Sequence, residues 1–125
     1  QGQGLAVFPY MHGNSYCAQV ADIEVKDGQI QVKKVVCAVD CGRIINPSLL
    51  IGQIEGGIIW GLSALLHGDV QFENGEVKLS NFHQHAVLRM NETPEIEVHL
   101  VNNDAEEPWG VGELGAPVIV PAVLN

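Results

Sequence analysis

Hydrophobic and polar positions alternate near the start of the chain in a way that predicts three β-strands. Residues 5–8 and 16–25 are rich in the apolar and β-branched side chains that strands favour. Asp27 and Gly28 tolerate the positive φ angles of a tight two-residue turn, so we expect a return strand over residues 29–39. This strand alternates in its first half and is apolar on both faces in its second, which predicts that the second half is buried.

A long helix is expected next, because Asn46 and Pro47 form a typical helix start. Asn accepts a hydrogen bond from a free N–H of the first turn, and Pro at the first helical position has no N–H to leave unsatisfied. The helical pattern continues to about His67, where Gly68 is expected to end the helix.

The interior of this helix contains four glycines, each of which costs about 1 kcal/mol of helix propensity relative to Ala. They are Gly52, Gly56, Gly57 and Gly61. Gly52 and Gly56 lie one turn apart and Gly61 lies near the same side, so this face lets another backbone or a ligand approach closely. On physical grounds close packing against another element is the commoner explanation, and ligand contact is the alternative.

Shorter segments complete the pattern. Asn74 and Gly75 predict a second hairpin, and Ile96, Val98 and Leu100 alternate in a later strand. The expected fold class is therefore α+β, with a mixed or antiparallel sheet and one long glycine-rich helix.

At 125 residues the chain is long enough for one compact domain and short for two. We therefore expect residues 1–125 to form a single domain or a fragment of one. The chain opens at Gln1 without an initiator Met and ends at Asn125 inside an apolar stretch, residues 118–124, where we expect a helix to begin. Both ends favour a piece of a longer protein.

The charge balance excludes some classes of partner. The formal net charge of −9 disfavours nucleic acid and anionic membrane surfaces, which both bind clustered Lys and Arg. No apolar run approaches the roughly 18 residues of a membrane span, and no basic leader precedes a cleavage site. A soluble domain without a membrane span is expected.

No metal site is expected from the cysteines and histidines. Cys17, Cys37 and Cys41 are too few for an iron–sulfur or zinc site and lack its spacing, and they do not form a disulfide framework. In an extended segment His83 and His85 would point to one side, but two ligands do not make a site.

Glu113 is the strongest candidate for a catalytic residue. It lies between Gly112 and Gly115, after an acidic loop and before an apolar helix, where a general base could be desolvated and tuned toward neutral pH. The alternative is a glycine-rich loop whose Glu caps the helix that begins near Pro117. With Gly110 these glycines match the spacing of a nucleotide-binding loop, but no strand directly precedes them, so we expect no nucleotide site.

Gln53 is a second candidate, because an amide in a glycine-rich helix can form paired hydrogen bonds with a polar heterocycle. Glu55 lies two residues away and so does not share its helix face. From composition alone, Gln53 is typical of a solvated helix surface.

Four stretches taken together resemble one protein family. They are residues 37–42 (CAVDCG), 46–47 (NP), 52–57 (GQIEGG) and 110–113 (GVGE). Their order and spacing are similar to those in the C-terminal part of the molybdopterin-binding large subunit of xanthine oxidase-type molybdenum hydroxylases. Within that family the chain most resembles the group of isoquinoline 1-oxidoreductase beta subunits and related bacterial aldehyde dehydrogenases.

The resemblance implies an oxidoreductase that carries molybdenum on a molybdopterin cofactor and passes electrons to iron–sulfur clusters in a partner subunit. It implies hydroxylation of an aldehyde or an N-heterocycle with oxygen from water. In that family the Glu of the Gly-Val-Gly-Glu motif is the base and the Gln of the Gly-Gln-x-Glu-Gly motif contacts the pterin. Glu113 and Gln53 match these positions, and Gly52, Gly56 and Gly112 are expected to allow close packing around the cofactor.

One residue differs from the family pattern, and other interpretations of the chain are open. Leu114 stands where relatives often have Pro, so a less rigid loop is expected. The family's other cofactor-binding loops lie upstream, so the isolated chain is expected to be inactive without the remainder of the molybdopterin-binding subunit. A non-catalytic scaffold or interaction domain that retains the fold is one alternative, and a parent closer to carbon monoxide dehydrogenase or hydroxybenzoyl-CoA reductase is another.

Overall fold

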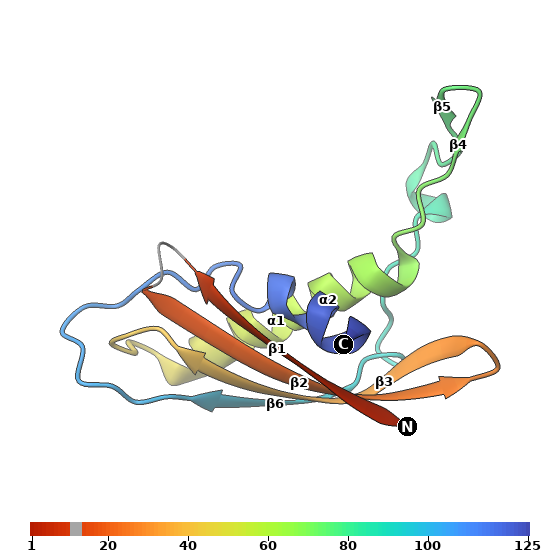
Figure 1. Cartoon of the computed structure of the whole chain (residues 1–125). Helices are drawn as coiled ribbons and strands as arrows, with labels where there is room; N and C mark the ends of the chain where they lie inside the picture. Colours follow the sequence, from red (N-terminus) through yellow and green to blue (C-terminus); the bar gives the residue numbers. More distant parts are fainter. Residues whose placement is uncertain (11–13) are drawn as a thin grey trace.

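A mixed four-stranded sheet forms the centre of the computed structural model, which describes residues 1–10 and 14–125. Its strands, in spatial order, are β1 (Gly2–Tyr10), β2 (Ser15–Lys26), β3 (Gln29–Asp40) and β6 (Glu95–Leu100). The first three pair antiparallel, and β6 pairs parallel with β3 (Figure 1). The predicted α+β fold and all four of its principal strands are confirmed.

Two helices, α1 (Pro47–His67) and α2 (Ala116–Leu124), lie on the same face of the sheet (Figure 1). α2 packs on β1 and β2, whereas α1 packs on α2 and β6. Val35, Cys37 and Val39 of β3 are fully buried, whereas Val36 and Ala38 on the other face are half-buried, so the predicted burial of the second half of this strand is confirmed for one face only. The core of α1 is the row Ile54, Ile58 and Leu62. Each of these three side chains contributes about 1.5–3 kcal/mol through removal from water.

Both predicted hairpin turns are present. The φ angles are 52° at Asp27, 77° at Gly28, 52° at Asn74 and 82° at Gly75, all in the left-handed region that these residue types tolerate. The second turn joins two short strands, β4 (Phe72–Glu73) and β5 (Glu76–Val77).

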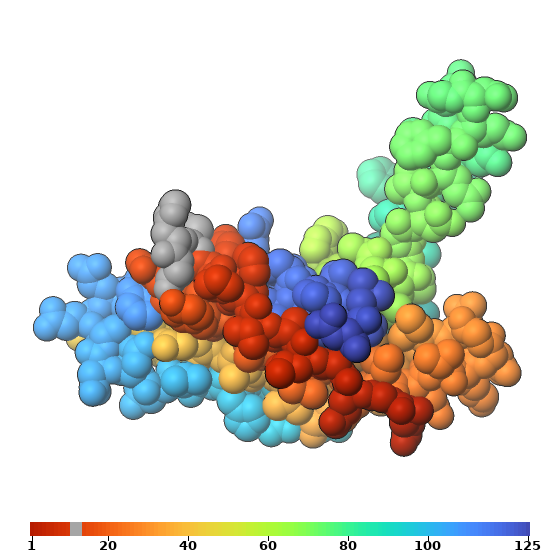
Figure 2. All heavy atoms as spheres, in the orientation of Figure 1, coloured from red at the N-terminus to blue at the C-terminus, as the bar shows by residue number. Residues whose placement is uncertain are grey.

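The β4–β5 hairpin and the 3-10 helix η1 (Phe82–Gln84) form an arm that projects from the C-terminal end of α1 (Figure 1). Figure 2 shows this arm standing clear of the sheet and its helices. At its base the Leu88 N–H donates a hydrogen bond of 3.0 Å to Ser63 Oγ on α1. His83 lies in η1 rather than in the extended segment assumed above, and the described residues contain no group of three or more possible metal ligands.

The ends of α1 follow the predicted capping. The Asn46 side chain accepts a hydrogen bond of 3.1 Å from the Leu49 N–H, and the Gly68 N–H donates one of 3.1 Å to Ala64 O. The predicted start at Pro47 and end at His67 are confirmed.

By length and composition α1 is apolar enough to cross a membrane, with 21 residues and a mean hydropathy of 1.6 over its most apolar 18-residue window. The expectation that no segment approaches a membrane span is therefore corrected. Core helices meet the same criterion, and α1 also supplies buried side chains to the core, so one such helix is weak evidence for a span.

Backbone approaches α1 closely at two of its glycines. A Cβ at Gly61 would lie 2.6 Å from Ala116 O, and one at Gly57 would lie 3.3 Å from Ala116 N. No atom lies within 4 Å of the Cβ position at Gly52 or Gly56. The predicted helix face that admits another backbone is present and includes Gly61, but its second glycine is Gly57 rather than Gly52 or Gly56. The reason is rotational, since Gly57 and Gly61 form their own row four residues apart, displaced from the row of Gly52 and Gly56.

A pair of glycine substitutions tests this packing. Gly61→Ala should lower the free energy of unfolding by about 1–3 kcal/mol, because its methyl group would overlap Ala116 O of α2. Gly52→Ala is the control, and it should raise the free energy of unfolding by up to about 1 kcal/mol because its site is open and Ala favours the helix. Urea unfolding followed by circular dichroism measures both, and equal stability of the two variants would contradict the packing.

Candidate functional site

A cleft of about 780 Å³ lies between α1, the end of β1, α2 and the loop that leads into α2. Four of the five predicted site residues line it: Gln53 and Gly56 from α1, and Gly112 and Glu113 from the loop. Gly52 is exposed and lies outside the cleft lining. The structure thus brings together two motifs that are far apart in the sequence and leaves one predicted residue out.

The two motifs are joined by a hydrogen bond. The Gln53 side chain donates through Nε2 to Gly112 O at 2.5 Å. Gln53 is exposed, as its residue type alone predicted, yet its amide is tied to the loop rather than free in solvent. The bond holds the glutamine of one motif beside the residue that precedes Glu113.

Glu113 is exposed, and its Oε2 accepts a hydrogen bond of 3.4 Å from the Tyr10 hydroxyl of β1. The alternative in which Glu113 caps the next helix is not supported, because α2 has no side-chain cap hydrogen bond. The expectation of a desolvated base is not met within these residues either. Further protein surface would have to cover the cleft to remove water from this carboxylate.

The loop before α2 is held by its backbone and by Leu114. The Leu114 side chain is fully buried, and its N–H donates a hydrogen bond of 3.2 Å to Val111 O. A Pro at this position would have no N–H to donate. The looser loop expected from the absence of Pro is therefore compensated by a buried side chain and a bond that Pro could not make.

Gln19 of β2 is a positioning residue that the sequence analysis missed. It is fully buried, and its Nε2 donates a hydrogen bond of 2.9 Å to Gly115 O. A Cβ at Gly115 would lie 2.6 Å from Ile54 O, so the loop is clamped between the sheet and α1. The signal was available, because Gln19 stands on the inward face of its strand between Cys17 and Ala21, where an amide needs a partner.

The CAVDCG motif lies elsewhere in the fold and is structural. Gly42 has a φ of 71°, and its N–H donates a hydrogen bond of 3.3 Å to Asp40 Oδ1, which also accepts one from the Asn103 side chain. Cys41 O accepts a hydrogen bond of 2.8 Å from the Trp109 N–H. The motif therefore anchors the exposed acidic loop to the end of β3.

The buried Cys37 thiol offers no nucleophile. Cys17 Sγ and Cys37 Sγ lie 3.5 Å apart, beyond the S–S bond length of about 2.05 Å, and both cysteines are free. The hydrogen bond to Cys17, together with burial, raises the pKa of the Cys37 thiol. Because the thiolate is the reactive form, the Cys37 thiol is inert in this environment.

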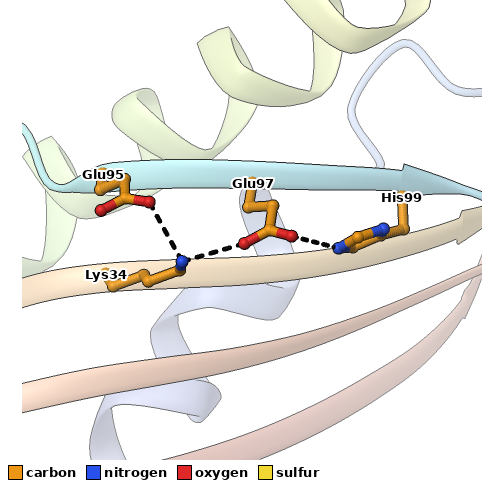
Figure 3. Close-up of polar contacts among 4 residues, drawn as sticks. All are labelled: Lys34, Glu95, Glu97 and His99. Atoms are coloured by element: carbon orange, nitrogen blue, oxygen red, sulfur yellow. Dashed lines mark hydrogen bonds and ion pairs between the residues drawn. The ribbon is translucent and has the colours of Figure 1, made fainter.

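A second polar cluster lies on the opposite face of the sheet from the helices (Figure 3). Lys34 Nζ lies 2.9 Å from Glu97 Oε2 and 3.0 Å from Glu95 Oε1, and His99 Nε2 lies 2.8 Å from Glu97 Oε1. The bonds to Glu97 and Glu95 raise the pKa of Lys34. The bonds from Lys34 and His99 lower the pKa of Glu97. This cluster links β3 to β6 and takes no part in the cleft.

The cluster generates a prediction about pH. Glu97, with its pKa held below its ordinary value of 4.5, stabilises the fold above that value and loses this contribution as pH falls through its folded pKa. Lys34, with its pKa held above 10.5, contributes below that value and loses the contribution at higher pH. Lys34→Met should therefore lower the urea midpoint most between about pH 5 and 10 and least near pH 2.

Lys26→Met is the matched control, because Lys26 is exposed and has no side-chain bond among those found in the structure. Its effect on the urea midpoint should be small at every pH. Parallel pH curves for the wild type and Lys34→Met would show that the cluster does not stabilise the folded chain.

Comparison with known proteins places the chain in a family. Residues 1–94 match the family model of the molybdopterin cofactor-binding domain, which includes Gln53 and α1 and ends before Glu113. The chain belongs to this family, as the resemblance predicted.

Individual relatives agree with this assignment. The chain is 41% identical over 98% of its length to isoquinoline 1-oxidoreductase subunit beta of Brevundimonas diminuta. It is 30% identical over 87% of its length to a protein of Gluconacetobacter polyoxogenes named membrane-bound aldehyde dehydrogenase [pyrroloquinoline-quinone]. The solved aldehyde oxidoreductase of Desulfovibrio desulfuricans matches 89% of the chain with a TM-score of 0.74 and 27% identity. The chain spans 16%, 14% and 13% of the lengths of these three proteins, respectively.

Proposed function

We propose that this chain is the C-terminal, cofactor-facing part of the molybdopterin-binding subunit of a molybdenum hydroxylase. The complete enzyme would hydroxylate an aldehyde or an N-heterocycle with oxygen from water and pass the electrons to iron–sulfur clusters in a partner subunit. Membership of the family supports the general oxidoreductase role. The observation that carries the proposal is that Gln53 and Glu113 line one cleft and are connected through Gly112.

The residues of the cleft fit the ring end of a pterin cofactor. Gln53 presents an amide, which has both donor and acceptor groups for a heterocycle edge. Gly56 leaves open space beside it, since no atom lies within 4 Å of its Cβ position. No Lys or Arg is among the described residues that line the cleft, so the phosphate of the cofactor would need cationic or N–H groups from the remainder of the subunit.

Gln53 and Glu113 would have different roles in the complete enzyme. The cofactor, when bound, supplies the two-electron oxidation. Gln53 would orient the ring by hydrogen bonding. Glu113 would accept a proton from the water-derived nucleophile at Oε1, because Tyr10 already donates to its Oε2. The remainder of the subunit would cover the exposed carboxylate and exclude water, which strengthens its basicity in the closed site.

Glu113→Gln tests the base directly. In the complete enzyme with its iron–sulfur partner, at matched molybdenum content, dye reduction driven by an aldehyde or an N-heterocycle should fall about a hundredfold or more. Glu106→Gln, which makes the same chemical change in the exposed acidic loop, is the control and should leave the rate unchanged. Equal rates for Glu113→Gln and the wild type would remove Glu113 from the mechanism.

Gln53→Ala tests cofactor binding. Loss of one or two hydrogen bonds to the ring should reduce the molybdenum retained per subunit by about two- to tenfold, measured by elemental analysis after gel filtration. Gln71→Ala on the arm is the control, since the side chain of Gln71 forms its hydrogen bond with Asp69, away from the cleft.

The wild-type protein should contain molybdenum and no pyrroloquinoline quinone. The opposite content would replace the proposed cofactor with the one in the name of the Gluconacetobacter relative.

A further inference from the structure

An exposed tryptophan stands in the same cleft as the proposed base. Trp60 of α1 retains 72% of its surface and lines the cleft together with Gln53 and Glu113. Leaving this much of an indole in water forgoes hydrophobic stabilisation, and large exposed apolar groups bordered by polar ones mark binding sites. Neither the family motifs nor the proposed mechanism uses Trp60.

The position of Trp60 on α1 shows what it faces. Gly56, Trp60 and Ala64 follow one another at four-residue intervals, and Gln53 lies seven residues before Trp60, so all four share one helix face. The neighbouring row, Gly57 and Gly61, is the one occupied by the backbone before and within α2. Both rows border the cleft, but only the row of Gly57 and Gly61 also contacts another backbone.

The row of Gly56, Trp60 and Ala64 has a single large side chain between two small ones. Gly56 lies one turn before the indole and Ala64 one turn after it, and both border the cleft. The open space at Gly56 is the one proposed above for the pterin, so a substrate ring would lie on the Ala64 side of the indole. A flat ring fits such a space and stacks against the indole, whereas a flexible chain gains little from the same surface.

Further aromatic rings line the cleft from β1. Phe8 and Tyr10 both border it, with ring centroids 6.3 Å apart and planes inclined at 45°, and Tyr10 contacts Glu113 through its hydroxyl. Glu113 is the only carboxylate among the described residues that line the cleft, and none of them is Lys or Arg. This charge arrangement disfavours an anion.

We propose that Trp60 is a specificity-determining residue that selects a flat aromatic substrate, uncharged or protonated, over an aliphatic or anionic one. The inference rests on the proposed function, in which a substrate reaches Glu113 in this cleft. Under this proposal, Trp60 determines whether the enzyme prefers aromatic or aliphatic substrates.

Trp60→Leu in the complete enzyme tests the selection. The ratio of kcat/KM for isoquinoline to kcat/KM for butanal should fall about three- to tenfold, mainly through KM for the ring substrate, because Leu is apolar but does not stack. Trp60→Phe keeps a ring and should restore most of the ratio. Trp109→Phe is the control, since Trp109 lies against Gly42 and outside the cleft lining, and it should leave the ratio unchanged. An unchanged ratio in Trp60→Leu would overturn the proposal.

A binding measurement supplies a readout without turnover. Isothermal titration of the cofactor-depleted complete enzyme with isoquinoline should show a Kd about three- to tenfold weaker in Trp60→Leu than in the wild type and unchanged in Trp109→Phe. Isoquinoline-1-carboxylate should bind the wild type more weakly than isoquinoline does. Equal Kd values for isoquinoline in Trp60→Leu and the wild type, or tighter binding of the anion, would count against the proposal.

The role of Glu113 and the role of Trp60 can be rejected independently of each other. Loss of both substrates' turnover in Glu113→Gln, with an unaltered substrate ratio in Trp60→Leu, would retain the proposed function and reject the role of Trp60. A changed isoquinoline Kd in Trp60→Leu, with full activity in Glu113→Gln, would retain the aromatic site and reject the proposed base.

Discussion

The structure depends on one close contact, in which the backbone of Gly115 and Ala116 packs against α1 beside Gly57 and Gly61. A side chain at Gly61 would overlap Ala116 O, and one at Gly115 would overlap Ile54 O. Through this contact α2 reaches the sheet, the loop lies along α1, and Gln53 meets Gly112. A larger residue at either glycine would separate the two elements that form the cleft.

Residues on different sides of α1 have different roles. Ile54, Ile58 and Leu62 bury one stripe, and their burial offsets the roughly 1 kcal/mol that each glycine costs in helix propensity. Gly57 and Gly61 admit backbone, whereas Gly56 leaves space in the cleft. One helix therefore supplies the core, an interface with another backbone and a wall of the candidate site.

The candidate site is open on the side where a cofactor and substrate would enter. Glu113 and Trp60 are exposed, and no cationic side chain is among the described residues that line the cleft. The chain spans about 13–16% of the length of the three relatives with which it was compared. In the proposed larger subunit, the remainder of the protein would supply the low dielectric and the anion-binding groups of the site.

The sequence by itself determined what depends on local chemistry: the strands, the two hairpin turns, the limits of α1 and the motifs that mark the family. Tight turns need residues such as Asp-Gly and Asn-Gly, and helix starts need a cap such as Asn46, so these features are readable from neighbours in the chain. Only the tertiary structure decided which glycines admit backbone, that β6 joins β3 in parallel, and that Tyr10 reaches Glu113. These facts depend on the angle at which α2 crosses α1 and on contacts between distant residues, which no local pattern specifies. Gln19 lies between the two cases, because its inward position was visible in the strand pattern but its partner, Gly115 O, was not.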